Sequence, residues 1–338
     1  MRPLLDHYSR PLRDLRISVT DRCNMRCPYC MPKEVFGRGF AFMPNSELLS
    51  FEELTRVCRI VAELGVSKIR LTGGEPLLRR ELERLVAMLA QVHGIDDIAL
   101  TTNGILLASK AQALKDAGLS RVTVSLDALD ERVFHSMSDT RLPLARILEG
   151  IDAADAVGLS PVKINMVVRR GVNDDCVLDM AEYFRNSSRT LRFIEYMDVG
   201  TTNEWKLDEV VPAAQIVEMI GARWPLQALP VSRDGEVASR YRYLDGAGEI
   251  GFIHSVSEPF CSGCTRARMS ADGKLYTCLF ASEGHDLRAR VRSDASDEEL
   301  GSYVREIWRA RSDRYSAERA QLNPTMPPKR VEMSYIGG

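Results

Sequence analysis

Leu15-Arg16-Ile17-Ser18-Val19-Thr20 is a strand-like stretch in which apolar residues alternate with polar ones. Similar stretches recur along the first 200 residues, and amphipathic, helix-like stretches separate them. A strand followed by a helix, repeated along the chain, predicts a parallel β-sheet of the α/β class. The six strand-like stretches are residues 15–20, 68–72, 98–102, 122–126, 162–167 and 191–196, and the clearest helix-like ones are 51–64, 79–92 and 105–117.

One side of these strands is polar. Strands that helices cover on both faces are normally apolar throughout, but here one parity carries charges such as Arg16, Arg70 and Lys163. An eight-stranded barrel fills its interior with side chains, whereas six strands bent into an incomplete barrel leave an opening for a large ligand. We therefore expect an incomplete, TIM-like (β/α)6 barrel with a polar inner face.

The pattern changes after about residue 200. A helix near residues 211–220, short strands, and a hairpin with an Asp272-Gly273 turn follow, and then a charged helix at about 294–311. We expect residues 1–200 to form the partial barrel and residues 201–338 to form a C-terminal α+β extension that ends in Gly337-Gly338.

Composition gives no sign of a nucleic-acid or membrane partner. The chain has 45 Lys and Arg residues against 47 Asp and Glu residues, so no overall field attracts a polyanion. It has neither a secretory signal nor a run of about 18 apolar residues. We expect a soluble cytoplasmic protein in which any selectivity for an anion is local.

Six of the eight cysteines fall into two tight triplets. Eight cysteines in a secreted chain would suggest disulfides, but this grouping indicates metal sites in a reducing compartment. We interpret the two remaining cysteines, Cys58 and Cys176, as small core residues. The triplets are Cys23, Cys27 and Cys30, and Cys261, Cys264 and Cys278.

The first triplet directly follows the first strand. Three thiolates can hold a [4Fe-4S] cube whose fourth iron lacks a protein ligand and stays open. Structural zinc normally takes four ligands, usually as two pairs, and no second pair lies nearby. We therefore favour a cluster.

The second triplet leaves two interpretations open. Its three thiolates could hold another cluster with an open iron. A zinc ribbon is the alternative, with His285 or an earlier residue as the fourth ligand.

Several cationic side chains lie on or near the predicted barrel strands, or between the cysteines of the second triplet, where they could bind a ligand. An isolated buried charge costs several kcal/mol in practice, and guanidinium groups match phosphate oxygens with paired hydrogen bonds. A phosphorylated ligand is therefore expected, and without a Gly-x4-Gly-Lys-[Ser/Thr] loop it would be held by side chains. These cations are Arg16, Arg70, Lys163, Arg192, Arg266 and Arg268.

Two motifs resemble the signature of the radical S-adenosylmethionine superfamily. They are the first triplet, with Tyr29 before its last cysteine, and Gly73-Gly74-Glu75-Pro76. The order of motifs from residue 15 to Tyr335-Ile336-Gly337-Gly338 resembles the GTP 3′,8-cyclase family, which acts first in molybdenum cofactor biosynthesis. Residues 136–146 look least like that family, and no expected ligand falls there.

The resemblance implies two [4Fe-4S] clusters, one for each triplet, and S-adenosylmethionine as cofactors. A deoxyadenosyl radical would remove hydrogen from C3′ of GTP, and bonding of C3′ to C8 would give 3′,8-cyclo-7,8-dihydro-GTP. By the same resemblance the Gly337-Gly338 tail is needed for turnover. The implied S-adenosylmethionine contacts are Tyr29, Gly74, Ser125 and Met197, and the implied GTP contacts are Arg16, Arg70, Thr101, Lys163, Arg192, Arg266, Ala267 and Arg268.

The implied partners are GTP, an electron donor, and the next pathway enzyme as recipient of the product; a homodimer is compatible with the sequence. Two other functions compete. One is a radical enzyme that modifies peptides or RNA, which the cationic inner face disfavours. The other is a noncatalytic iron-sulfur sensor, which the near-neutral charge and the Gly-Gly-Glu-Pro motif disfavour.

Overall fold

The structure is a computed structural model that describes residues 3–232, 235–319 and 330–338. Its centre is a twelve-stranded sheet with the strand order β12-β11-β10-β1-β2-β3-β4-β5-β6-β9-β8-β7. The six N-terminal strands lie side by side, parallel and in chain order. This confirms the predicted βα repeat. They are β1 (Asp14–Ser18), β2 (Lys68–Thr72), β3 (Asp97–Thr102), β4 (Arg121–Ser125), β5 (Lys163–Val168) and β6 (Thr190–Glu195).

The C-terminal region extends this sheet at both edges. Strand β10 (Arg266–Met269) pairs parallel with β1, and β9 (Glu249–Ile253) pairs parallel with β6. The expected boundary between residues 200 and 201 falls in the loop after β6, so strands from both sides of it share one sheet. Four antiparallel strands complete the edges: β11 (Lys274–Tyr276) and β12 (His285–Asp286) beyond β10, and β8 (Ser239–Tyr243) and β7 (Leu226–Ala228) beyond β9.

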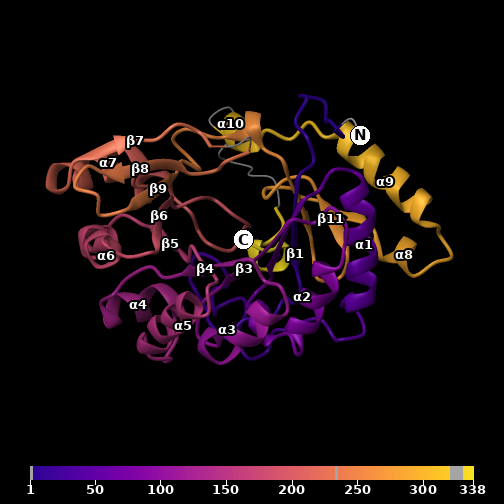
Figure 1. Ribbon diagram of the computed structural model, residues 1–338, viewed down its shortest axis with the longest axis horizontal. Coiled ribbons are helices and arrows are strands. Elements are labelled where there is room, and N and C mark those ends of the chain that lie inside the picture. Colours follow the sequence, from indigo (N-terminus) through magenta and orange to yellow (C-terminus); the bar gives the residue numbers. More distant parts are fainter. Residues whose placement is uncertain (1–2, 233–234, 320–329) are drawn as a thin grey trace.

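Most of the helices lie on the outer, convex side of the curved sheet, as Figure 1 shows. The first of them begins at a capping box, in which the Ser50 and Glu53 side chains satisfy each other's backbone N–H groups. The α-helices are α1 (Phe51–Glu63), α2 (Leu82–Ala90), α3 (Leu107–Asp116), α4 (Glu131–Ser138), α5 (Ala145–Ala156), α6 (Val177–Phe184), α7 (Ala213–Arg223), α8 (Arg288–Val291), α9 (Asp297–Ala310), α10 (Tyr315–Glu318) and α11 (Met333–Ile336).

The apolar parity of the strands packs against these helices. Ile17, Ile69 and Val122 are completely buried there, and the two lone cysteines, Cys58 and Cys176, belong to the same core. Since successive residues of a strand point to opposite faces, the polar parity faces the inside of the curve, where the C-terminus also lies (Figure 1). None of the helices in the described part of the chain is long and apolar enough to cross a membrane.

Candidate active site

The loop after β2 packs directly against the segment that leads into the first cysteine triplet. The Gly74 and Glu75 N–H groups donate to the carbonyls of Thr20 and Arg22, both at 2.8 Å. A Cβ on Gly73 would lie 2.6 Å from the Thr20 oxygen, and one on Gly74 would collide with the Arg22 carbonyl group. Only glycine allows this approach, so the Gly-Gly pair places the start of the cysteine loop.

Glu75 continues this support with its side chain. Burial raises the pKa of its carboxyl to about 7, and the carboxyl accepts hydrogen bonds from the Thr102 hydroxyl and the Asn103 N–H, both at 2.7 Å. The Asn103 amide donates in turn to the Asn24 side chain at 2.7 Å. A chain of hydrogen bonds thus runs from the Gly-Gly-Glu-Pro motif to the residue beside Cys23.

Arg26 stabilises the cysteine loop, residues 23–30, to which it belongs. Its guanidinium donates to the Cys23 carbonyl at 2.8 Å and to the Phe36 carbonyl at 2.7 Å, while its own N–H bonds to the Ser138 carbonyl at 3.0 Å. Ser138 lies in the stretch that looked least like the expected family. That stretch therefore supports the cysteine loop, although it supplies none of the expected ligands.

The three thiols of the first triplet are partly buried and influence one another. Burial raises the pKa of Cys23 to about 11 and that of Cys30 to about 12, and Cys23 contributes to the rise at Cys30. The pKa of Cys27 rises well above its usual range because of burial and the other two thiols. Three such thiols need a metal to ionise together, which fits the donor set of an iron-sulfur cube.

Tyr29 points to a residue that the sequence did not single out. Its hydroxyl donates to the Asp127 carboxylate at 2.7 Å, and the other carboxylate oxygen accepts the Val167 N–H at 2.8 Å. Burial raises the pKa of Asp127 to about 6. Asp127 follows β4 and thus fixes the tyrosine of the cysteine loop against the sheet; its signs in the sequence were its place two residues after a strand and its position on the polar side of that strand.

The remaining residues expected at S-adenosylmethionine lie at the same edge. Ser125 is the last residue of β4, and Met197 follows β6 by two residues. The carboxyl ends of parallel strands are where such sheets place their ligands. Tyr29, Gly74, Ser125 and Met197 therefore lie along one edge of the sheet.

The inner face carries a row of guanidinium groups from three neighbouring strands. Arg16 on β1 is in register with Arg70 on β2 and with Arg268 on β10. Arg70 donates to the hydroxyls of Thr101 at 3.0 Å and Thr123 at 3.3 Å. The register thus gathers one arginine from the extension and two from the partial barrel, which spacing along the chain could not show.

These cations lower one another's pKa. Burial and the neighbouring arginines bring the pKa of Arg16 to about 9, that of Arg70 to about 10 and that of Lys163 to about 7. Burial and Arg121 bring the pKa of Arg192 to about 10. Within the described residues none of these four side chains forms an ion pair with a carboxylate. We call this cluster of cations on the inner face the cationic chamber; its charge favours an anionic ligand.

Arg266 and Ala267 differ in what they can offer a ligand. The Arg266 guanidinium lies on the polar parity, donates to the Cys264 sulfur at 3.3 Å and stacks over Phe260. Ala267 has the opposite parity, and its methyl group belongs to the hydrophobic core, where it is 1% exposed. Any contact from Ala267 to a ligand would have to come from its backbone.

The second triplet surrounds the start of β10. Cys261 is the first residue of a short 3-10 turn, η4 (Cys261–Gly263), Cys264 directly follows that turn, and Cys278 follows β11. Burial would raise the pKa of Cys264, but Arg266 and Arg311 outweigh it and lower the pKa to about 6. Burial raises the pKa of Cys278 to about 11. This triplet therefore differs from the first in having two guanidinium groups in hydrogen-bond contact with one of its sulfurs.

The geometry bears on the zinc alternative. His285 lies exposed on the edge strand β12. In the described part of the chain no group of three or more His, Cys, Asp or Glu side chains converges on the position of a single metal ion. A zinc ion needs its four ligands around one centre, whereas a cube takes each thiolate on a different iron.

The C-terminal tail lies against the inner face. The Arg268 guanidinium donates to the Gly337 carbonyl, and Gly337, at φ +78°, lies so close to Thr72 that a Cβ would collide with it. Ile336 before it is completely buried, and Gly338 follows at the chain end. The two glycines thus lie beside the end of β2, next to the Gly-Gly-Glu-Pro loop.

Comparison with known proteins identifies the family. The model of the Radical SAM superfamily matches residues 17–184, and that of Molybdenum Cofactor Synthesis C matches residues 189–317. A GTP 3′,8-cyclase from Acidothermus cellulolyticus is 53% identical, with 99% of each chain covered. Another from Staphylococcus aureus strain JH9 is 50% identical, with 98% of each covered. The chain belongs to the GTP 3′,8-cyclase family.

Membership of the GTP 3′,8-cyclase family confirms the family expected from the motifs. The radical SAM match contains the first triplet and the Gly-Gly-Glu-Pro loop, and such a domain implies a [4Fe-4S] cluster and a site for S-adenosylmethionine. Among solved structures, Streptococcus suis SuiB bound to S-adenosylmethionine has a TM-score of 0.62 at 15% identity, over 88% of this chain and 68% of SuiB. That likeness confirms the radical SAM fold.

Proposed function

We propose that this chain converts GTP to 3′,8-cyclo-7,8-dihydro-GTP, the first step of molybdenum cofactor biosynthesis. The single observation that carries the proposal is the row of arginines on the inner face of the sheet whose first strand leads into the radical SAM cysteine triplet; among the described residues these arginines form no ion pair with a carboxylate. A compact, highly charged anion such as a nucleoside triphosphate matches this chamber better than a peptide does.

When bound, a reduced [4Fe-4S] cluster and S-adenosylmethionine supply a deoxyadenosyl radical, which takes the C3′ hydrogen of GTP so that C3′ can bond to C8. The first triplet would hold that cluster. Tyr29, Gly74, Ser125 and Met197 would contact S-adenosylmethionine from the carboxyl edge of the sheet. The protein's own contribution is to hold both reactants in contact and to exclude water.

GTP would lie between the two triplets. Its phosphates would bind the guanidinium row and Lys163, and each anionic oxygen would relieve the repulsion that lowers the pKa values of these cations. The remaining contacts would come from Thr101, Arg192 and the segment Arg266, Ala267 and Arg268, with Ala267 contributing through its backbone.

The second triplet would hold a second [4Fe-4S] cluster whose open iron binds the guanine edge of GTP. The support for this is the donor set: three cysteines, one of them with a lowered pKa, beside arginines assigned to the nucleotide. Gly337 and Gly338 would act at the reacting end of the chamber, since the tail lies beside β2 and is held by Arg268.

In the cell we propose a cytoplasmic enzyme that takes electrons from a separate donor and passes its product to the next enzyme of the pathway. We also propose that residues 1–200 act as the radical-generating unit and residues 201–338 as the substrate unit. Neither nucleic acid nor a membrane has a part in this proposal, and it accommodates a homodimer.

The test is substrate-dependent cleavage of S-adenosylmethionine. Anaerobically reconstituted protein with a reductant should form deoxyadenosine far faster with GTP than with ATP or a peptide. Equal yields with all three would contradict the assignment to GTP. Intact S-adenosylmethionine in every reaction, with the cluster bound, would instead indicate a sensor.

A further inference from the structure

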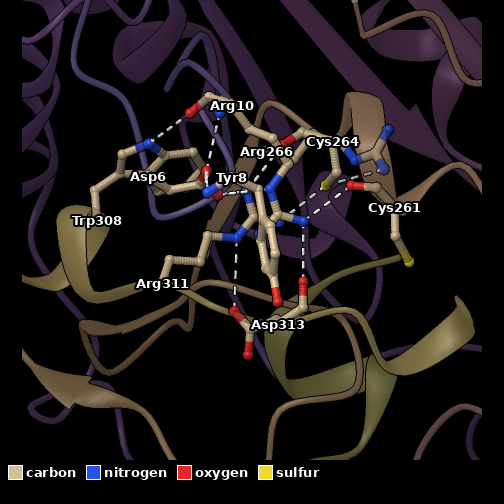
Figure 2. Close-up of polar contacts among 9 residues, drawn as sticks. All are labelled: Asp6, Tyr8, Arg10, Cys261, Cys264, Arg266, Trp308, Arg311 and Asp313. Atoms are coloured by element: carbon tan, nitrogen blue, oxygen red, sulfur yellow. Dashed lines mark hydrogen bonds and ion pairs between the residues drawn. The ribbon is translucent and has the colours of Figure 1, made fainter. Parts of the chain in front are cut away.

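Two segments far from the second triplet in sequence meet beside Cys261 and Cys264, as Figure 2 shows. One is the N-terminal segment with Asp6 and Arg10, and the other is the end of α9 with Arg311. Asp6 lies between the two arginines, 2.6 Å from Arg10 Nε and 3.5 Å from Arg311 Nη1. The three side chains are between 0% and 2% exposed, so this is a buried charge cluster.

The two arginines reach the backbone on either side of the 3-10 turn. Arg10 donates to the Cys261 carbonyl at 2.9 Å, and Arg311 donates to the Cys264 carbonyl at 2.8 Å. Trp308 on α9 donates to the Arg10 carbonyl at 3.1 Å, which ties the helix to the N-terminal segment. The turn that carries two cysteines is thus held at both ends.

Arg311 also reaches a sulfur atom directly. Its second guanidinium nitrogen, Nη2, lies 3.1 Å from Cys264 Sγ, closer than the Arg266 nitrogen at 3.3 Å. Its other neighbours fix its direction, because the ring of Trp308 lies 4.5 Å from its central carbon and Asp313 lies 3.5 Å from Nε. The fork of a guanidinium allows this simultaneous contact with a carbonyl and a sulfur, which an ammonium group cannot reproduce.

The charges at this place do not cancel among the side chains alone. Three guanidinium groups, those of Arg10, Arg311 and Arg266, gather here against two carboxylates, Asp6 and the partly exposed Asp313. A buried cation with incomplete compensation costs free energy. An iron-sulfur cluster held by three cysteine thiolates is anionic and would supply the missing negative charge.

We propose that Arg311 is a positioning residue for the second cluster: it orients Cys264 and donates a charge-assisted N–H···S hydrogen bond to its sulfur. Asp6 holds Arg311 and Arg10 in place. The inference rests on the proposed function in taking Cys264 as a ligand of a cluster. Hydrogen bonds to the ligand sulfurs and nearby charge set the potential of such clusters, and a donor with positive charge favours the reduced form.

The experiment uses the full chain with the first three cysteines replaced by alanine, so that all bound iron belongs to the second triplet. In this background Arg311→Lys keeps the charge against Asp6 but loses the fork. Arg56→Lys is the matched control, because Arg56 also spans carbonyl groups and a carboxylate, Asp297, but contacts neither triplet. The measurements are iron and sulfide content, the EPR spectrum of the reduced cluster and its midpoint potential.

We expect Arg311→Lys to bind iron with an altered EPR spectrum and a more negative midpoint potential, while Arg56→Lys matches the parent. An unchanged potential and spectrum would overturn the proposal. Loss of iron from a folded Arg311→Lys protein would support it. If that variant unfolds, Arg311→Gln decides by the same criteria, and unfolding of both beside a folded Arg56→Lys would make Arg311 a structural residue and overturn the proposal. A parent without iron would refute the second cluster itself, and with it this inference.

Discussion

Lys163 should make the binding of GTP dependent on pH. Burial and the cations Arg192, Arg121, Lys68 and Arg70 bring the pKa of Lys163 to about 7. In the free protein the amine is therefore mostly neutral above pH 7. A bound triphosphate favours the charged form and raises this pKa, so binding takes up a proton and affinity falls as the pH rises.

The size of the effect follows from one proton. With a free pKa near 7 and a bound value well above 8.5, the dissociation constant of GTP should rise about 15-fold between pH 7 and 8.5. Lys163→Arg should remove most of this dependence, because an arginine among the same cations, Arg192, has a pKa of about 10 and stays charged in that range.

Calorimetry without reductant measures this directly, because titrations in buffers of different ionisation enthalpy count the protons taken up. At pH 8 we expect nearly one proton for the parent and about one fewer for Lys163→Arg. Lys115→Arg is the control, since Lys115 donates to a surface carbonyl, that of Gly158, away from the chamber. Equal proton counts in the parent and Lys163→Arg would refute the reasoning.

Three further predictions follow from the site. Replacing the three cysteines of the second triplet by alanine should remove about half the iron and sulfide and leave the signal of the first cluster; unchanged iron with lost zinc would contradict this. Deleting Gly337 and Gly338 should leave iron content and GTP binding nearly intact but abolish cyclisation. Full activity of the truncated protein would show that the tail has no role in the reaction. Gly74→Ala should lower the free energy of unfolding by about 1–3 kcal/mol, because its Cβ meets the rigid Arg22 carbonyl. Gly221→Ala, in open space on α7, should be neutral or stabilising by roughly 0.5–1 kcal/mol in the same denaturation experiment.

The parts of the fold that depend on neighbouring residues could be predicted from the sequence. The six parallel strands were predicted to within a few residues, because alternation of apolar and polar residues is a local pattern. The polar parity predicted the inner face for the same reason. The hairpin from β10 to β11 followed from its Asp272-Gly273 turn.

The parts that depend on distant pairing could not be predicted. Nothing local shows that β10 joins the edge beside β1, and this pairing is what brings Arg268 into register with Arg16. Asp6 and Arg311 are 305 positions apart in the numbering and meet only through the fold. Arg311 was predicted only as the end of a charged helix, because its role depends on which sulfur the folded chain places beside it.

The central claim is that the radical formed at the first triplet removes hydrogen from C3′ of GTP. GTP that carries deuterium at C3′ tests it directly in a single turnover of the reconstituted protein. We predict deoxyadenosine with one added deuterium from this substrate, and none from GTP labelled at C2′. Unlabelled deoxyadenosine from the C3′-labelled substrate would contradict the account.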